Sequence, residues 1–360
     1  MADSTQSNDG KARAYWRDSV ASYERPSYPR AALDLLTSAV AYVALMVAMY
    51  LLVGSHPWLV LALALPTSGF LLRTFIVFHD CTHGSFLPTK RENRWVGRIT
   101  GLLVFQPYAN WGHNHAVHHG TAGDLDRRGQ GDVETLTAAE YAARSWKGRL
   151  AYRLFRSPGI LFVVGPLWSL MIGPRFWNKN MRTRQIHSVW LTDAALVVVV
   201  GLTVWATSPT DWLLVQMPAA MLAGIAGVFL FYVQHQFEDA YWETGESWDY
   251  ADAALKGSSY LKLPAFFRFF SGNIGLHHVH HLSAKIPNYA LQRAHTESPI
   301  FAEVPVLTFA DGVRSLRLKL IDPDGGRLLT WAEARELTAA TRRADLRSAG
   351  IARRNPGTAP

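Results

Sequence analysis

The sequence predicts an all-α integral membrane protein, in which four transmembrane helices form two hairpins and a cytoplasmic helical domain carries a histidine-rich metal site. Three observations predict this fold. The apolar residues gather in four long runs, which come in two pairs with very short connections. Lys and Arg concentrate between the two pairs. Ten of the 14 histidines fall in three short windows, residues 79–83, 113–119 and 277–281.

Each apolar run reaches the roughly 20 residues that a helix needs to cross a bilayer. Three residues separate the two members of each pair, which predicts helical hairpins. Asp34, Arg73 and Asp193 are charged exceptions within these segments, and each needs a partner or a route for its charge to the membrane surface. The expected spans are residues 31–53 and 57–78 in the first pair and residues 188–207 and 211–234 in the second.

The distribution of Lys and Arg predicts the orientation. Both short connections lack these residues, whereas the segment 79–187 is rich in them. Because cytoplasmic loops carry the excess of Lys and Arg, we expect a multi-pass protein of the cell membrane whose metal site and termini are cytoplasmic. The expected parts are a cytoplasmic N-terminal segment 1–30, a main domain 31–300 with the spans and the site, and a cytoplasmic C-terminal tail 301–360.

Two further segments have distinctive compositions. Residues 152–177 are apolar, but prolines and glycines interrupt them, so an interfacial or re-entrant path is expected instead of a span. In the tail, residues 330–350 are typical of a surface helix, and residues 353–360 are expected to be disordered.

Composition excludes several kinds of site. The single cysteine, Cys81, excludes an internal disulfide and a cysteine-based zinc or iron–sulfur site. The formal charge of +8 would suit nucleic acid, anionic lipid or an acidic protein. Four membrane spans make nucleic acid the least favoured of these partners.

The spacing of the clustered histidines indicates metal binding. Residues three and four apart share one face of a helix, so the histidines within each cluster can converge. Adjacent histidines diverge by about 100° around a helix and can therefore reach two neighbouring ions. Neutral imidazole suits zinc, copper, iron and nickel, so this pattern predicts a dinuclear site without naming the metal. The candidate ligands are His79 and His83, then His115, His118 and His119, then His277, His280 and His281.

These clusters resemble the three histidine boxes of the membrane fatty acid desaturase family. The matching segments are residues 79–85, 111–121 and 272–281. The segments 123–132 and Ile286-Pro287-Asn288-Tyr289 are similar to the bacterial acyl-lipid branch, of the delta-12 or omega-6 and delta-5 types. The resemblance covers roughly residues 30–300, and three boxes in order between two hairpins form a specific signal.

The resemblance implies an oxygen-dependent fatty acyl desaturase that inserts a cis double bond into a lipid-linked acyl chain. It implies two non-heme iron ions held by the eight histidines above, with His235 as a ninth ligand near the end of the last span. Some relatives carry an Asn one turn earlier that reaches a metal through water, whereas this chain has Phe231. Electrons are expected from a separate ferredoxin-type protein, and an apolar tunnel is expected between the spans.

Other residues near the boxes have weaker assignments. Metal-bound histidines usually donate their second ring N–H to a carboxylate or carbonyl, and five carboxylates lie near the boxes in sequence. These carboxylates are Asp80, Asp124, Asp126, Glu238 and Asp239. The histidines expected to stay outside the metal site are His56, His113, His187, His278 and His295.

Alternatives remain at this point. An acyl-chain hydroxylase, epoxygenase or conjugase, or a carotenoid oxygenase, would use similar boxes. A metal or proton transporter would instead place histidines inside the spans near the midplane. A zinc hydrolase needs three protein ligands and one open position, not eight or nine histidines.

Overall fold

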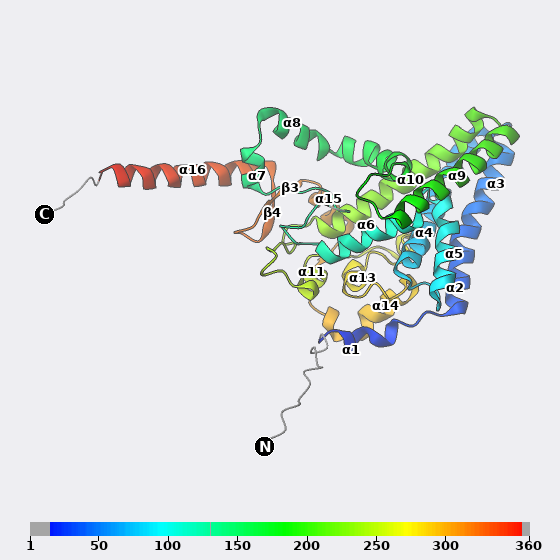
Figure 1. Cartoon of the computed structure of the whole chain (residues 1–360), viewed down its shortest axis with the longest axis horizontal. Coiled ribbons are helices and arrows are strands. Elements are labelled where there is room, and N and C mark those ends of the chain that lie inside the picture. The colour runs from blue at the N-terminus through cyan, green and yellow to red at the C-terminus, as the bar shows by residue number, and fades with distance from the viewer. Residues whose placement is uncertain (1–14, 130, 355–360) are drawn as a thin grey trace, which may run out of the picture.

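Four long apolar helices dominate the structure, a computed structural model that describes residues 15–129 and 131–354 (Figure 1). By length and composition, each of the four could cross a membrane. They are Tyr28–Leu52, Pro57–His83, Thr183–Ala206 and Pro209–His235. The rest of the described chain is mainly helical, as predicted, with shorter helices gathered around one end of the long ones.

In the first pair of long helices, the first begins before its predicted start at residue 31 and the second ends after its predicted end at residue 78. The first helix consists of α2 (Tyr28–Leu35), a π-helical segment (Leu36–Val40) and α3 (Ala41–Leu52). The second, α4 (Pro57–His83), continues past residue 78 and ends at Gly84, whose φ of 72° closes the helix. The first histidine cluster therefore lies within the last two turns of this long helix.

The second pair consists of α9 (Thr183–Ala206) and α10 (Pro209–His235). Helix α10 packs along α4, and their contact surface joins α3 in one apolar core. A buried hydrogen bond from Gln216 Nε2 to Tyr42 Oη, at 3.2 Å, also links α10 to α3. This packing fixes the ends of α4 and α10 relative to each other.

The three charged residues named above as exceptions, Asp34, Arg73 and Asp193, all have partners. Arg73 pairs with Asp34 and also donates to the carbonyl oxygen of Phe269. Asp193 accepts from Arg175 at 2.5 Å. The expectation that these charges need compensation is confirmed.

The apolar segment between the pairs follows a broken path, as its prolines predicted. Helix α8 (Trp146–Phe155) is followed by two π-helical segments and a 3₁₀ turn within 160–175, and the axis bends by 56°. Pro166 and Leu170 of this segment lie against Gly224 of α10.

Shorter helices surround the histidine-bearing end of α4. They include α5 (Lys90–Leu103), α6 (Tyr108–Thr121), α11 (Tyr250–Lys256), α13 (His277–Leu282) and α14 (Asn288–Glu297). Helix α12 (Ala265–Phe270) lies against α4 nearer its middle, with Phe270 close to Gly69. Helix α7 (Ala138–Ala143) packs instead on the C-terminal part of the chain. Helix α1 (Arg17–Val20) and Tyr23 pack on the core that holds α11, α13 and α14. The described part of the N-terminal segment is thus packed against this region.

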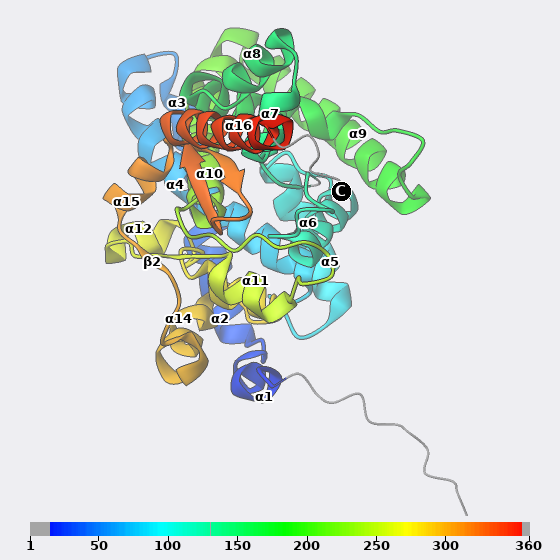
Figure 2. The ribbon, with the colours of Figure 1, turned by 90° about the vertical axis from the view of Figure 1, so that its left-hand side faces the viewer.

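The all-α prediction missed four short strands. β1 (Tyr260–Leu261) pairs in parallel with β2 (Val306–Leu307), and β3 (Leu318–Asp322) pairs antiparallel with β4 (Arg327–Thr330). The β3–β4 pair is largely buried beside the end of α10, where Tyr232 Oη donates to the Leu318 carbonyl (Figure 2). Strands this short give little periodic signal, so tertiary packing decides their conformation.

Two helices complete the C-terminal part, α15 (Phe309–Ser315) and α16 (Trp331–Arg354). Helix α16 extends away from the rest of the molecule (Figure 1). The predicted surface helix is confirmed, and it runs four residues beyond residue 350. The segment predicted to be disordered lies mostly outside the described residues.

Candidate metal centre

All nine predicted histidines converge where α4 and α10 end, beside α6 and α13. They form two groups, and within each group the candidate ligand atoms lie within 4.8 Å of one another. The first group has five members, His79, His83, His115, His119 and His280. The second has four members, His118, His235, His277 and His281.

Helical geometry sorts the histidines between the groups. Pairs four residues apart, such as His115 and His119, stay together because they share a helix face. Adjacent residues separate: His118 and His119 belong to different groups, as do His280 and His281. The divergence expected of neighbouring histidines is therefore present in both boxes.

A glycine allows the third box to approach the first. Gly272 has a φ of 52°, and a Cβ there would lie 2.8 Å from Ile76 Cγ2 of α4. Only a residue without a side chain fits this approach without strain. The loop that leads into α13 is thus held close to the helix that carries His79.

Contacts between ring nitrogens fit a bound cation better than an imidazole network. His115 Nε2 lies 2.9 Å from His79 Nε2 and 3.2 Å from His119 Nε2. A neutral ring nitrogen carries either one proton or one lone pair, so it cannot satisfy both contacts. An ion between the rings would accept a lone pair from each.

Unpartnered nitrogens give the same indication. Among the described residues, several buried ring nitrogens of the two groups have no hydrogen-bond partner, including His83 Nε2, His118 Nε2 and His281 Nε2. A metal–nitrogen bond is about 2 Å long, so nitrogens on opposite sides of one ion lie about 4 Å apart. The spread of each group is close to that value, so each could hold one ion.

Burial keeps the imidazoles in the form that binds metals. Desolvation, followed by the charges of neighbouring imidazoles, holds five ring pKa values well below their usual range. Neutral imidazole is the metal ligand, so these side chains are ready to bind at neutral pH. They are His115, His119, His277, His280 and His281.

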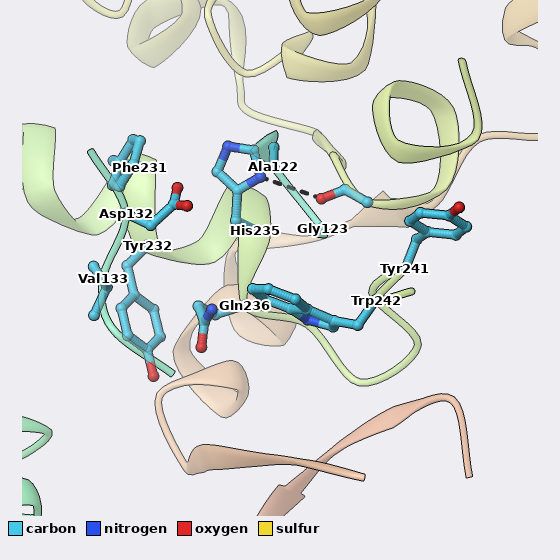
Figure 3. A pocket seen from close by; sticks show the side chains of 11 residues that line it. Ala122, Gly123, Asp132, Val133, Phe231, Tyr232, His235, Gln236, Tyr241 and Trp242 are labelled. Atoms are coloured by element: carbon cyan, nitrogen blue, oxygen red, sulfur yellow. Dashed lines mark hydrogen bonds between the residues drawn. The ribbon is translucent and has the colours of Figure 1, made fainter. Parts of the chain in front are cut away.

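Three ligand candidates have their second nitrogen fixed by an oxygen. His79 Nδ1 lies 3.0 Å from Asp80 Oδ1, and His118 Nδ1 bonds to Asp132 Oδ1. His235 Nδ1 lies 3.2 Å from the Gly257 carbonyl oxygen, the contact dashed in Figure 3. In each case the bond turns Nε2 toward the group of histidines.

Of the five candidate carboxylates near the boxes, Asp80 contacts a histidine ring, and the other four have other partners or lie at the surface. Asp124 accepts from the Arg127 side chain at 2.5 Å and from the Asp126 amide at 2.9 Å. Asp126 accepts from the Gly245 amide at 2.9 Å. Glu238 and Asp239 are exposed. Nearness in sequence misled here because the loops after α6 and α10 carry these side chains away from the rings.

Asp132 was missed as a histidine partner, although it belongs to the segment 123–132 that resembles the family. It lies 14 residues after His118, and a loop brings it back to α6. Gly131, with a φ of 80°, permits the return: a Cβ there would lie 3.0 Å from both Asn114 O and His118 Cβ. The Gly131-Asp132 pair was the signal that could have identified this partner.

The other histidines lie outside the two groups, as predicted. His278 Nε2 lies 3.1 Å from His295 Nδ1. His56 Nδ1 contacts Ser55 Oγ at 2.8 Å in the loop between α3 and α4, and His187 is exposed. His113 is partly exposed on α6.

An apolar side chain flanks the four-histidine group. The Phe231 ring lies 5.2 Å from the His118 ring and 5.5 Å from the His235 ring, between centroids. Beside it is a cavity of about 20 Å³, bordered also by Asp132, His235 and Trp242 (Figure 3). This volume has room for a single water molecule.

Comparison with known proteins decides the family. A sequence model described as "Fatty acid desaturase" matches residues 55–309, well over half of the chain. The chain belongs to the fatty acid desaturase family. It is therefore an oxidoreductase that desaturates fatty acyl chains, and the resemblance seen in the histidine boxes is confirmed.

Several relatives support this assignment. The chain is 41% identical over 312 residues to a "Fatty acid desaturase" of Bacillus subtilis, covering 87% of this desaturase and 89% of the relative. It is 29% identical over 241 residues to a Synechocystis protein named "sn-1 acyl-lipid omega-3 desaturase (ferredoxin)", covering 64% of each. It is 28% identical over 253 residues to the Synechocystis "sn-1 oleoyl-lipid 12-desaturase", covering 66% of this chain and 68% of the relative.

Proposed function

We propose that this desaturase inserts a cis double bond into a lipid-linked acyl chain, using O₂ and two iron ions held by the nine histidines. The observation that carries the proposal is the division of these histidines into groups of five and four with converging nitrogens. Imidazole binds several transition metals, and membership of an oxidoreductase family favours a redox-active one; iron is the metal that the resemblance to the family implies.

The bound irons would supply the oxidising power that removal of two hydrogens from an unactivated methylene pair requires. The chain's own residues bind the metals, orient the ligands and exclude water. Asp80 and Asp132 orient His79 and His118. Trp111 stacks on His115 with ring centroids 4.4 Å apart and, with Phe231, keeps the surroundings of the rings apolar.

The proposed substrate and electron donor follow from relatives and from charge. Two relatives carry names that specify an acyl-lipid or oleoyl-lipid substrate, and one name includes ferredoxin. We infer an acyl lipid as substrate and a separate ferredoxin-type protein as electron donor. The net charge of +8 would favour an acidic donor.

We infer that the four apolar helices cross the cell membrane as two hairpins and that both metal groups lie on the cytoplasmic side. The short connections at residues 53–56 and 207–208 lack Lys and Arg, whereas the long connection 84–182 is rich in them. Residues 31–300 would then carry the reaction, and the segments 1–30 and 301–360 would both be cytoplasmic.

Mass spectrometry of the acyl chains tests the function. Cells that express the chain should contain a new unsaturated fatty acid, and its fragmentation gives the position of the double bond. His280→Ala removes a member of the five-histidine group and should abolish the product. The matched control, His187→Ala, changes an exposed histidine outside both groups and should keep it.

Other products would change the proposal in defined ways. A hydroxylated or epoxidised acyl chain would agree with the proposed metal site but would show that the reaction is not desaturation. A modified carotenoid would replace the substrate as well. An unchanged lipid profile, in cells supplied with iron and a ferredoxin, would contradict the proposed substrate.

A further inference from the structure

The segment Ile286-Pro287-Asn288-Tyr289 has no role in the proposed chemistry, yet it reaches the metal centre. Asn288 is the first residue of α14 and is 1% exposed. Its backbone N–H donates to Asp80 Oδ2 at 2.6 Å, and its Nδ2 donates to the same oxygen at 3.0 Å. The other carboxylate oxygen, Asp80 Oδ1, contacts His79 Nδ1. Asn288 therefore holds the carboxylate that orients a candidate ligand.

The same amide extends the chain of bonds into the first membrane helix. Asn288 Nδ2 also donates to Asp34 Oδ2 at 2.8 Å, and Asp34 pairs with Arg73 of α4. Arg73 in turn donates to the Phe269 carbonyl at the end of α12. A continuous series of contacts thus runs from α12 through α4, α2 and α14 to the imidazole of His79.

The charges along this series do not cancel within it. Asp34 and Asp80 are 3% and 2% exposed, and Arg73 pairs directly with only one of them, Asp34. Asp80 faces the N-terminus of α14 and the ring of His79. The positive end of the helix dipole favours a carboxylate there, and a cation bound to the far nitrogen of His79 would balance its charge.

Tyr289 has a different task from its neighbour. Its hydroxyl donates to the Phe86 carbonyl at 3.0 Å and accepts from the Ser27 amide at 3.0 Å. These bonds fasten the loop after α4 and the segment before α2. The two residues therefore separate a purely structural contact from one directed at the metal centre.

The geometry points to Asn288 as a positioning residue for the five-histidine metal site, acting through Asp80 on His79. By donating to both Asp80 and Asp34, its amide also links the Arg73–Asp34 ion pair to the orientation of this ligand. The inference rests on the proposed two-iron centre. It adds Asn288, a residue outside the histidine boxes, to the residues that orient the metal ligands.

The test uses the full chain loaded with iron and examined by Mössbauer spectroscopy, which reports the environment of each iron separately. Asn288→Leu should shift the signal of one iron and leave the other unchanged. The variant should also bind that iron about 10- to 100-fold more weakly than the unaltered chain, as measured by competition with a chelator. A role in folding alone would not shift the signal of one iron while the signal of the other stays unchanged.

Asn93→Leu is the matched control. Asn93 is also 1% exposed and bonds to local backbone groups, the amides of Phe86 and Leu87 and two carbonyls. Its replacement should lower thermal stability and leave both iron signals in place. If Asn288→Leu does not fold, Asp34→Asn keeps the side-chain shape, removes the distant charge and should shift the same signal.

The outcomes separate this inference from the proposed function. Two iron signals in the unaltered chain, unchanged by Asn288→Leu or by Asp34→Asn, would overturn the positioning role and leave the function intact. Fewer than two irons per polypeptide in the unaltered chain, by elemental analysis of the same sample, would contradict the proposed two-iron centre itself.

Discussion

Asp132 shows what a single residue contributes to the metal centre and why its sequence position conceals it. Eight of the nine histidines could be identified from spacing, because helical periodicity fixes which of them share a face, whereas His235 followed from the family resemblance. The partner of His118 could not be identified from spacing. Asp132 lies 14 residues after His118, and a loop with a left-handed Gly131 brings it back to α6. Such a return depends on loop conformation, and loop conformation has no periodic signal.

Replacing Asp132 should weaken one metal site. Asp132→Asn removes the charge that faces His118 Nδ1. The four-histidine group of this variant should therefore bind iron about 10- to 100-fold more weakly than that of the unaltered chain, and a chelator should remove this iron. Metal analysis after dialysis measures this loss. Asp126→Asn is the control, because the Asp126 side chain accepts from the Gly245 amide in its loop, and equal iron loss from both variants would contradict the assignment.

At the scale of elements, the long helices were predictable and the close contacts between them were not. Runs of apolar residues determine where α4 and α10 lie in sequence, but α4 continues through the first box to His83. The strand pair β3–β4 escaped prediction because its residues are few and buried on both faces. Tertiary contacts, including the bond from Tyr232 to the Leu318 carbonyl, hold it in place.

Gly224 gives a test of helix packing. A Cβ at this position of α10 would lie 2.7 Å from Pro166 and 2.8 Å from Leu170 in the bent segment. Gly224→Val should therefore destabilise the protein by about 1–3 kcal/mol through overpacking. Thermal unfolding in detergent measures the effect.

Gly201→Val provides the comparison within α9. A Cβ at Gly201 would have nothing within 4 Å among the described residues. The apparent melting temperature of the Gly201→Val variant should therefore stay near that of the unaltered chain. Equal destabilisation by the two substitutions would show that the bent segment does not pack on α10 as described.

At the scale of the whole molecule, the metal centre depends on four segments far apart in sequence meeting at one end of the long helices. The ends of α4 and α10 supply three histidines, while α6 and α13 supply six. The membrane orientation proposed here puts this end in the cytoplasm and the connection at residues 53–56 outside.

Cysteine labelling tests that orientation. The single native cysteine, Cys81, is buried, so it should give little background. Ser55→Cys lies in the exposed connection between α3 and α4 and should react with a membrane-impermeant maleimide on intact cells. Glu336→Cys, on the exposed surface of α16, should react only after the membrane is opened. The reverse pattern would contradict a cytoplasmic metal centre.

The number of irons per chain tests the central claim most directly. The full chain, produced with sufficient iron and purified in detergent, should contain two irons per polypeptide by elemental analysis. Replacing His83 should weaken the site of the five-histidine group, and replacing His281 should weaken the site of the four-histidine group. A chain active in desaturation with a single iron, or with both sites filled by another metal, would contradict the account.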